Sequence, residues 1–428
     1  MTSSSSPDKN LPAHISVVVI GGGQAGLAMS YQLTQSGIEH VVLEKNQIAH
    51  SWKTQRWDAF CLVTPNWQCQ LPGYPYQGSD PKGFMLRDEI VGYVESYARH
   101  FSAPVKEGVA VTRLRQEPSG GFALETSAGH ISADAVVLAV SGYHLPKIPQ
   151  MSDRLDRSVS QLHSSAYRNP EQLPDGEVMV VGTGQSGCQI AEDLHLAGRK
   201  VHLVVGSAPR CPRVYRGREA VEWLDDLGQY DLPVDQHKLK ENVRKNANHY
   251  LTGRDGGRDI DLRRFALEGM SLYGRLKDIQ HGQLQFGDDL VANLDNADRV
   301  YNGICGLIDE HIARNAIEAP LQPHYQPVWQ PKTPAATLDP VAAGISTVIW
   351  TTGFRSDWSW IELPIFDGAG YPTHRRGVTS MEGVYVLGLP WLYTWGSGRF
   401  VGVGRDSDFI AKHIVAGSEK AADQSVAA

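Results

Sequence analysis

Three glycines near the N-terminus have the spacing that lets a backbone turn hold the pyrophosphate of a dinucleotide. The turn at residues 21–26 contains Gly21, Gly23 and Gly26. It directly follows the short apolar run at 16–20 and precedes the helix-compatible residues 27–35. The first glycine permits a tight turn, the second lets the phosphates approach the backbone, and the third lets the helix pack on the strand. The pattern predicts a strand, a turn and a helix whose N-terminus faces the phosphates.

A carboxylate stands where such a site binds the ribose. Residues 40–43 predict a second strand, which ends in Glu44. An acid about 20 residues after the glycines can accept hydrogen bonds from ribose hydroxyls. Glycine turns of this spacing also occur without a ligand, but the two strands and the acid together favour a dinucleotide site.

The same pattern returns in the middle of the chain. Residues 177–181 predict a strand that leads into a second glycine turn, and residues 188–197 and 200–205 predict the helix and strand that follow it. The glycines of this turn are Gly182, Gly184 and Gly187. The second strand leads into Gly206 and Ser207, with no acid. Four arginines follow closely, namely Arg210, Arg213, Arg216 and Arg218.

The charges after this strand indicate which nicotinamide dinucleotide binds there. An acid would repel the 2′-phosphate of NADPH, whereas arginines can pair with it. The sequence therefore favours NADPH over NADH, with Ser207, Arg210 and Arg213 as contacts. Alternatively, the arginines form a solvated loop face.

The bulk composition restricts the class of protein. The chain has 428 residues, 41% of them hydrophobic, and a net charge of -7, which predicts two or three globular domains and neither a nucleic-acid nor an anionic-lipid partner. No apolar run approaches the roughly 20 residues that span a bilayer. Residues 1–12 are polar and do not resemble a signal peptide, so a disordered lead-in and a cytoplasmic protein are expected. The five cysteines form neither a C-x-x-C pair nor a cluster with histidines, so no metal site is predicted.

The order of predicted strands indicates an α/β fold with two dinucleotide-binding, Rossmann-like domains. The strand at 134–139 leads into a proline-containing crossover, and further apolar strands occur at 347–350 and 383–388. The second domain is therefore predicted to be inserted into the first. The predicted bounds are 13–145 and 345–428 for the first domain, 146–213 and 338–344 for the second, and 214–337 for a mostly helical insertion or lid with a possible helix at 300–316.

A further motif carries a family resemblance. Residues 163–168, His-Ser-Ser-Ala-Tyr-Arg, resemble the end of the F-x-G-x-x-x-H-x-x-x-Y motif of the flavin-containing monooxygenases, although Arg157 and Val159 replace its phenylalanine and glycine. The bacterial members similar to plant YUCCA enzymes are the best match, and a flavin-dependent oxidoreductase group found with nitrilase gene clusters is a looser one. Other similar stretches are 52–58, 71–73, 351–355 and 402–406.

The resemblance implies FAD at the first glycine turn and NADPH at the second. In this family NADPH reduces the flavin, and O2 then forms a flavin hydroperoxide that oxygenates a small nucleophilic nitrogen, sulfur or carbonyl compound. The cofactor supplies the reactive chemistry, so few acid or base side chains are needed. The cofactor contacts that motif and resemblance together imply, besides the glycines and residues named above, are Gln24, Ala25, Lys45, Trp52, Gln185, Ser186, Thr352 and Gly353.

Three residues are candidates for catalytic roles by resemblance. Asn66 follows Thr64-Pro65 in the segment where family members place an asparagine beside the flavin's reactive edge, or it is an ordinary turn asparagine. His163 and Tyr167 could orient the nicotinamide or couple the domains, or they could be structural, and Ser164 shares these alternatives.

Tryptophans and a glycine-rich segment surround the expected flavin site. The indoles either line an apolar substrate pocket or fill the core: Trp52, Trp57, Trp67, Trp358, Trp360, Trp391 and Trp395. The helix expected at 406–415 either directs its N-terminus at the flavin or simply ends the chain.

The leading expectation is a monooxygenase that acts on a small molecule and O2 and that could form a homodimer. Two other function classes remain open beside it. An electron-transfer flavoprotein would pass electrons to a disulfide or another protein, and a flavin-binding sensor would not be catalytic.

Overall fold

A ten-stranded sheet carries the first glycine turn. In this computed structural model, which describes residues 10–426, β1 (His14–Ile20) lies between β2 (His40–Glu44) and β8 (Gly129–Leu138) and runs parallel to both. β5 (Val105–Glu107) extends the sheet beyond β2. The inner strands are runs of buried Val, Ile and Leu, as is typical of parallel strands covered on both faces.

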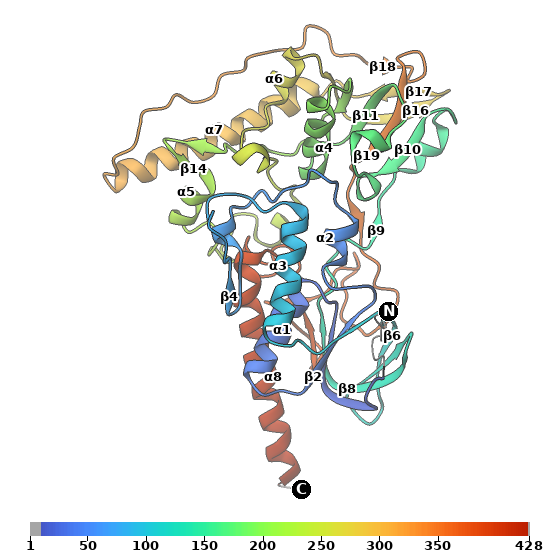
Figure 1. Ribbon diagram of the computed structural model, residues 1–428, viewed down its shortest axis with the longest axis vertical. Helices are drawn as coiled ribbons and strands as arrows, with labels where there is room; N and C mark the ends of the chain where they lie inside the picture. The colour runs from blue at the N-terminus through green and yellow to red at the C-terminus, as the bar shows by residue number, and fades with distance from the viewer. Residues whose placement is uncertain (1–9, 427–428) are drawn as a thin grey trace, which may run out of the picture.

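The two ends of the chain build this sheet and its helices together. β24 (Val384–Val386) pairs in parallel with the end of β8, although more than 240 residues separate them. The helices packed here are α1 (Gln24–Gln35), α3 (Arg87–His100) and α8 (Phe400–Val426), with α1 against α8 (Figure 1). An antiparallel arm of β6 (Val111–Gln116) and β7 (Phe122–Thr126) continues from β8.

A separate five-stranded sheet carries the second glycine turn. All of its strands run parallel, in the order β10 (Ser160–His163), β19 (Ile345–Trp350), β11 (Glu177–Val181), β12 (Val201–Val204) and β15 (Ser271–Tyr273). The helix that follows the turn is α4 (Gln185–Leu196), which begins three residues earlier than its predicted start. Both predicted strand-turn-helix units therefore form, and each lies in its own sheet.

The predicted point of return to the first domain, residue 345, is wrong. β19 pairs with β10 and β11, so it belongs to the second sheet. A buried strand has the same apolar pattern in either sheet, and only its pairing partners decide which sheet it joins. The chain crosses back after Trp350, and β20 (Phe354–Arg355) pairs with β9 (Leu145–Pro146) at the crossover.

The prediction of a mostly helical insertion at 214–337 is also wrong. The segment contributes β15 to the second sheet and contains the hairpin of β16 (Leu276–Gln280) and β17 (Gln283–Phe286). Its longest helix is α7 (Leu290–Arg314), which includes most of the predicted helix at 300–316 (Figure 1). It also contains two short helices, α5 (Ala220–Asp226) and α6 (Leu262–Leu267). The composition is polar because much of the segment is surface.

The remaining elements are short. They are α2 (His50–Thr54), β3 (Gln70–Leu71), β4 (Tyr74–Pro75), β13 (Val214–Tyr215), β14 (Arg218–Glu219), β18 (Thr337–Leu338), β21 (Ile361–Glu362), β22 (His374–Arg375) and β23 (Val378–Thr379), with short 3₁₀ turns at 66–68, 150–154, 164–166, 170–172, 240–245 and 254–256.

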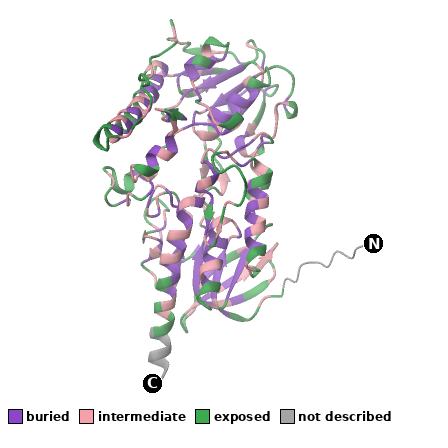
Figure 2. Cartoon of the chain, turned by 60° about the vertical axis from the view of Figure 1, so that its left-hand side comes forward, coloured by how far each residue is buried: buried purple, intermediate pink, exposed green. Residues whose placement is uncertain are grey.

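Buried residues concentrate in the two sheets and in the helix faces turned toward them (Figure 2). Most of the predicted lead-in, residues 1–9, lies outside the described residues, and residues 10–12 form no helix or strand. Within 10–426, no helix combines the length and apolarity needed to cross a bilayer.

Candidate active site

The first glycine turn has the geometry of a phosphate site. Gly21 has a φ of 109°, and a Cβ on it would lie 2.6 Å from the Ala139 carbonyl oxygen. A Cβ on Gly26 would lie 1.8 Å from the Gly21 carbonyl oxygen, so the start of α1 packs directly on the turn. A Cβ on Gly23 would meet no protein atom within 4 Å. The turn is therefore closed toward the sheet and open toward a ligand.

Glu44 stands at the end of β2 beside this turn. Its Oε2 accepts a hydrogen bond from the Gly22 backbone nitrogen at 2.7 Å, and its Oε1 accepts one from the Asn46 backbone nitrogen at 2.8 Å. Each carboxylate oxygen can accept a further bond, so the side chain is held ready for a ribose hydroxyl.

A cavity of about 660 Å³ opens beside the turn. Its lining includes Gly21, Gly23, Glu44 and Lys45 from the first sheet and Gln185 and Gln189 from α4 of the second sheet. The volume lies within the range of about 300–1,000 Å³ that small-molecule sites occupy. One space is therefore accessible from both glycine-turn units.

Trp52 and Gln24 join the two ends of the chain at the cavity wall. Trp52 Nε1 donates to Gln24 Oε1 at 2.9 Å, and Gln24 Nε2 donates to the Gly398 carbonyl oxygen at 2.9 Å. The Trp52 ring stacks on Phe400, the first residue of α8, with centroids 6.1 Å apart. These contacts place the N-terminus of α8 beside the cavity.

Four of the seven indoles named above line this space, namely Trp52, Trp360, Trp391 and Trp395, whereas Trp57, Trp67 and Trp358 do not.

The second glycine turn repeats the closed and open sides of the first. A Cβ on Gly187 would lie 2.0 Å from the Gly182 carbonyl oxygen, whereas a Cβ on Gly184 would meet nothing within 4 Å. Thr351 Oγ1 donates to the Val181 carbonyl oxygen at 2.7 Å, which ties β19 to the turn. Thr352 donates to the Lys147 carbonyl oxygen, and Ser186 and Gly353 lie in the flanking segments.

Comparison with known proteins identifies the family of this site. Residues 18–225 match the pyridine nucleotide-disulphide oxidoreductase family. An uncharacterized CzcO-like oxidoreductase from Geobacillus kaustophilus is 33% identical over 405 residues, covering 94% of this chain and 98% of the relative. The chain belongs to the CzcO-like oxidoreductases of the flavin-containing monooxygenase family.

Two further relatives agree with this assignment. Indole-3-pyruvate monooxygenase YUCCA4 of Oryza sativa subsp. japonica is 30% identical over 205 residues, 44% of this chain and 46% of the relative. A flavin-containing monooxygenase structure from Stenotrophomonas maltophilia shares the fold with a TM-score of 0.64 at 19% identity, covering 95% of this chain and 100% of that one. The chain is therefore an oxidoreductase of this family that uses a flavin and a pyridine nucleotide.

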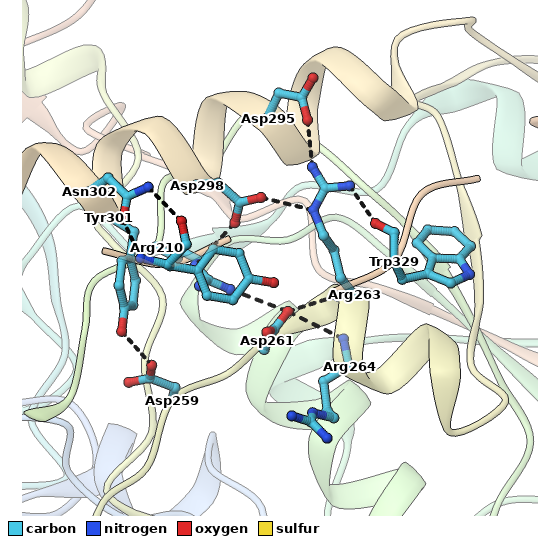
Figure 3. Close-up of polar contacts among 11 residues, drawn as sticks. Arg210, Asp259, Asp261, Arg263, Arg264, Asp295, Asp298, Tyr301, Asn302 and Trp329 are labelled. Atoms are coloured by element: carbon cyan, nitrogen blue, oxygen red, sulfur yellow. Dashed lines mark hydrogen bonds and ion pairs between the residues drawn. The ribbon is translucent and has the colours of Figure 1, made fainter. Parts of the chain in front are cut away.

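The prediction that Arg210 binds a 2′-phosphate is wrong, because its guanidinium is enclosed by protein (Figure 3). It lies between the rings of Tyr301 and Tyr325, 4.3 and 3.9 Å from their centroids. Its Nη1 lies 3.3 Å from Asp261 Oδ1 and its Nε 3.4 Å from Asp298 Oδ1. Only 2% of the residue is exposed.

The other three arginines are also paired with carboxylates. Arg213 Nη1 donates to Glu219 Oε1 at 2.6 Å, and its Nη2 donates to the Val63 carbonyl oxygen at 2.9 Å. Arg216 pairs with Asp309 at 2.5 Å and Arg218 with Asp226 at 2.8 Å. All four arginines are therefore paired with carboxylates, Arg210 and Arg213 in the interior and Arg216 and Arg218 with partly exposed side chains. Ser207 is exposed after β12, with no charged residue beside it in sequence.

Replacement of Arg213 is therefore expected to change stability and not coenzyme preference. Arg213→Gln leaves the buried Glu219 carboxylate without its cation and should lower the free energy of unfolding by about 3 kcal/mol. The ratio of kcat/KM for NADPH to that for NADH should stay within about twofold of the original. Urea unfolding and steady-state kinetics measure the two quantities, and a ratio that falls tenfold at unchanged stability would restore Arg213 to the nucleotide site.

His163 fastens the second sheet to the cavity wall. Its Nδ1 accepts from the Ser165 backbone nitrogen at 3.2 Å, and its Nε2 donates to the Gly353 carbonyl oxygen at 2.9 Å. Its ring meets the edge of Phe354, which lines the cavity, at 4.8 Å between centroids. Burial lowers the pKa of His163, so the ring is a neutral positioning group.

Tyr167 lies fully buried outside the cavity lining. Its hydroxyl donates to Asp193 Oδ2 at 2.7 Å, and Arg254 Nη1 donates to Asp193 Oδ1 at 2.6 Å. Burial raises the pKa of the Tyr167 phenol. The side chain thus joins the 163–168 segment to α4 and the 254–256 turn, and Ser164, also buried, lies in the same segment.

Asn66 differs from the prediction. Its Nδ2 donates to the Asp80 carbonyl oxygen at 2.9 Å, and its Oδ1 accepts from the Met85 backbone nitrogen at 2.8 Å. The cavity lining includes Thr64 but not Asn66. Its amide orders the 80–85 loop, which explains why a turn asparagine follows Pro65.

The cavity also contains residues that the sequence did not single out. They include Arg56, Phe60, Tyr143, His144, Gln189, Asn248 and Arg399. They come from segments up to 343 positions apart, and no spacing rule connects them. Arg56 lies within the family-like stretch 52–58, which was the one available signal.

Proposed function

We propose that this enzyme is an FAD-dependent monooxygenase that uses NADPH or NADH to transfer one atom of O2 to a small organic substrate. The observation that carries the proposal is the cavity lined from both glycine-turn units, because flavin and nicotinamide must meet for hydride transfer. Both coenzymes are named because residues 205–218, which directly follow β12, contain no carboxylate, and each of their four arginines is paired with an acid elsewhere.

The residues that would hold the cofactors follow from the open sides of the turns. The N-terminus of α1 beside Gly23 suits the FAD diphosphate, Glu44 suits its ribose, and the N-terminus of α4 beside Gly184 suits the nicotinamide dinucleotide. The reduced flavin supplies the activation of O2. The aromatic wall excludes water, and His163 holds the 353–354 turn that forms part of that wall.

The reaction balances as substrate + O2 + NAD(P)H + H⁺ giving oxygenated substrate + H2O + NAD(P)⁺. The substrate classes proposed are a nucleophilic nitrogen, a sulfide or a carbonyl compound. The YUCCA4 relative is named for a carbonyl substrate, indole-3-pyruvate, which favours including the last class.

Product stoichiometry tests the proposal. FAD-loaded enzyme is given NADPH and ¹⁸O2 with methyl phenyl sulfide, N,N-dimethylaniline or phenylacetone as probes. At least one probe is expected to gain a single ¹⁸O atom in a yield that approaches one per NADPH oxidised. If no probe gains ¹⁸O, and the H2O2 formed or the added electron acceptor reduced equals the NADPH oxidised, the electron-transfer alternative replaces the monooxygenase.

The cysteines argue against electron transfer to a disulfide. All five are free and buried, and burial raises their pKa values, to about 11 for Cys61 and about 12 for Cys69 and Cys305. A disulfide relay needs a thiolate that forms readily, and these environments oppose one.

A further inference from the structure

A line of aromatic rings leads from the cavity to the protein surface. The Trp52 ring lines the cavity and stacks on Phe400 with centroids 6.1 Å apart. Phe400 meets Tyr93 edge to face at 5.5 Å, and Tyr93 stacks on Tyr74 at 5.7 Å. Tyr74 ends the line, 4.9 Å from the exposed ring of His100. Aromatic rings in contact have centroids about 4.5–7 Å apart, so each ring contacts the next.

Helix α3 and the hairpin of β3 and β4 hold the outer part of this line. Tyr93 and His100 lie seven positions apart on α3, so they project from the same face of the helix. Tyr74 lies in β4, and the hairpin is fastened to α3 because the Leu71 backbone nitrogen donates to the Tyr93 hydroxyl at 3.1 Å. The order of the rings therefore follows from the packing of rigid elements.

The buried tyrosines of this region have no group that could accept their phenolic protons. The Tyr93 hydroxyl lies 2.9 Å from the Cys69 carbonyl oxygen and 2.6 Å from that of Tyr74, and a backbone carbonyl is too weak a base to take the proton. Tyr97, fully buried and 5.8 Å from Tyr74, has no partner for its hydroxyl among the described residues. Burial raises the pKa of both phenols. If either ring lost an electron, it would keep its proton and readily take an electron from a neighbouring ring.

Tyr74 differs from these residues because it is partly exposed and lies beside His100. An imidazole can accept a proton near neutral pH, directly or through a bridging water. A Tyr74 phenol that loses an electron can therefore also lose its proton, and the neutral radical that remains is harder to reduce than a protonated one. An oxidising equivalent that enters the line would come to rest at Tyr74.

We propose that this line of rings carries single electrons from Tyr74 to an oxidant in the cavity, so that oxidising equivalents leave the cavity at the protein surface. Tryptophan and tyrosine are the aromatic side chains that most readily lose one electron. Phe400 is not itself oxidised and serves as the contact between Trp52 and Tyr93. The inference goes beyond the proposed function and needs only that a flavin occupies the cavity.

The step balances at Tyr74 and in solution. One electron leaves the Tyr74 phenol for the oxidant, the phenolic O–H bond breaks, and the proton goes to the His100 imidazole. A low-molecular-weight thiol then restores the phenol by giving it a hydrogen atom, and two of the resulting thiyl radicals join as a disulfide. The rings of the cavity wall, such as Trp391 and Trp395, are thereby spared oxidation.

Illumination of the bound, oxidised flavin supplies a one-electron oxidant inside the cavity and tests the path. Flavin-loaded enzyme is illuminated without O2, NADPH or thiol in the presence of a nitroso spin trap, and peptide mass spectrometry locates the adducts. We expect an adduct at Tyr74. If no adduct forms there, or if adducts form only at cavity residues such as Tyr143, the proposal is overturned, and the oxygen-transfer test of the proposed function is unaffected.

Two tyrosines of α3 provide a matched pair of variants. Tyr93→Phe keeps the ring but not the readily oxidised phenol, so it should lower the adduct yield at Tyr74 at least tenfold. Tyr97→Phe removes a phenol that also lies beside Tyr74 but off the line from Phe400, so it should leave the yield unchanged. Circular dichroism and flavin content per chain check that both variants fold and bind the cofactor. Equal yields in the two variants would show that Tyr74 is oxidised from solution and would overturn the proposal.

His100→Ala tests the proton acceptor. The adduct yield at Tyr74 should fall severalfold, and imidazole added to the solution should restore it, which a purely structural role of His100 does not predict. A fall that imidazole does not reverse would overturn the role of His100 in the step.

Discussion

Gly23→Ala is expected to preserve the fold and to weaken FAD binding at least a hundredfold, equivalent to about 2.8 kcal/mol. A Cβ on Gly23 meets no protein atom within 4 Å, so the folded chain accommodates it. The backbone at Gly23 has φ -82° and ψ -176°, which alanine adopts without strain. The space that the methyl group enters is the space proposed for the diphosphate, so the cost falls on the cofactor alone.

The matching substitution in the second turn is the control. Gly184→Ala also meets open space and lies at φ -63°, so it should retain FAD while the affinity for NADPH and NADH falls by a similar factor. Gly26→Ala places its Cβ 1.8 Å from the Gly21 carbonyl oxygen and should instead prevent folding of the unit. FAD content, flavin reduction rates and circular dichroism distinguish the three. If Gly184→Ala releases FAD and Gly23→Ala does not, the assignment of the two cofactors is reversed.

Asp406→Asn is expected to raise the free energy of unfolding more at pH 8 than at pH 4. The difference between the two pH values should be up to about 3 kcal/mol. Asp406 lies 1% exposed in α8, and no described group completes a well-aligned hydrogen bond to either carboxylate oxygen. Burial raises its pKa to about 6, while the nearby Ser397 hydroxyl and the Arg376 and Arg405 charges oppose the rise only in part.

The sign follows from proton binding. Because the folded pKa is higher than the unfolded one, the folded state holds its proton as the pH rises from about 4 to about 6, while the unfolded chain ionises. The free energy of unfolding of the original enzyme therefore falls as the pH rises over this window. The asparagine variant has no carboxyl at this position, so it does not show this fall. Urea unfolding at both pH values measures the difference, with Asp408→Asn, at a more exposed carboxylate paired with Lys412, as control. If the variant and the original enzyme differ in free energy of unfolding by the same amount at both pH values, burial does not raise the pKa of Asp406 in the folded state.

The sequence by itself determined the two strand-turn-helix units. Each lies within about 30 consecutive residues, and each glycine has its role for a local reason: a positive φ at Gly21, close packing at Gly26 and an open side at Gly23. Glu44 is part of the same local unit, so its place beside the turn also followed from spacing. The family resemblance extended this to the whole chain, and the α/β class with two Rossmann-like sheets was correct.

The tertiary structure alone decided which side chains reach the cavity. Four arginines after β12 form an apparent phosphate site in the sequence, but the distant Asp298 and Asp309 engage two of them, and acids nearby in the chain engage the other two. Arg56 and Arg399 look ordinary in the sequence, yet both line the cavity, and no carboxylate among the described residues forms an ion pair with either. Charge recognition depends on which partners long-range packing brings within a few ångströms, and local spacing contains no record of those partners.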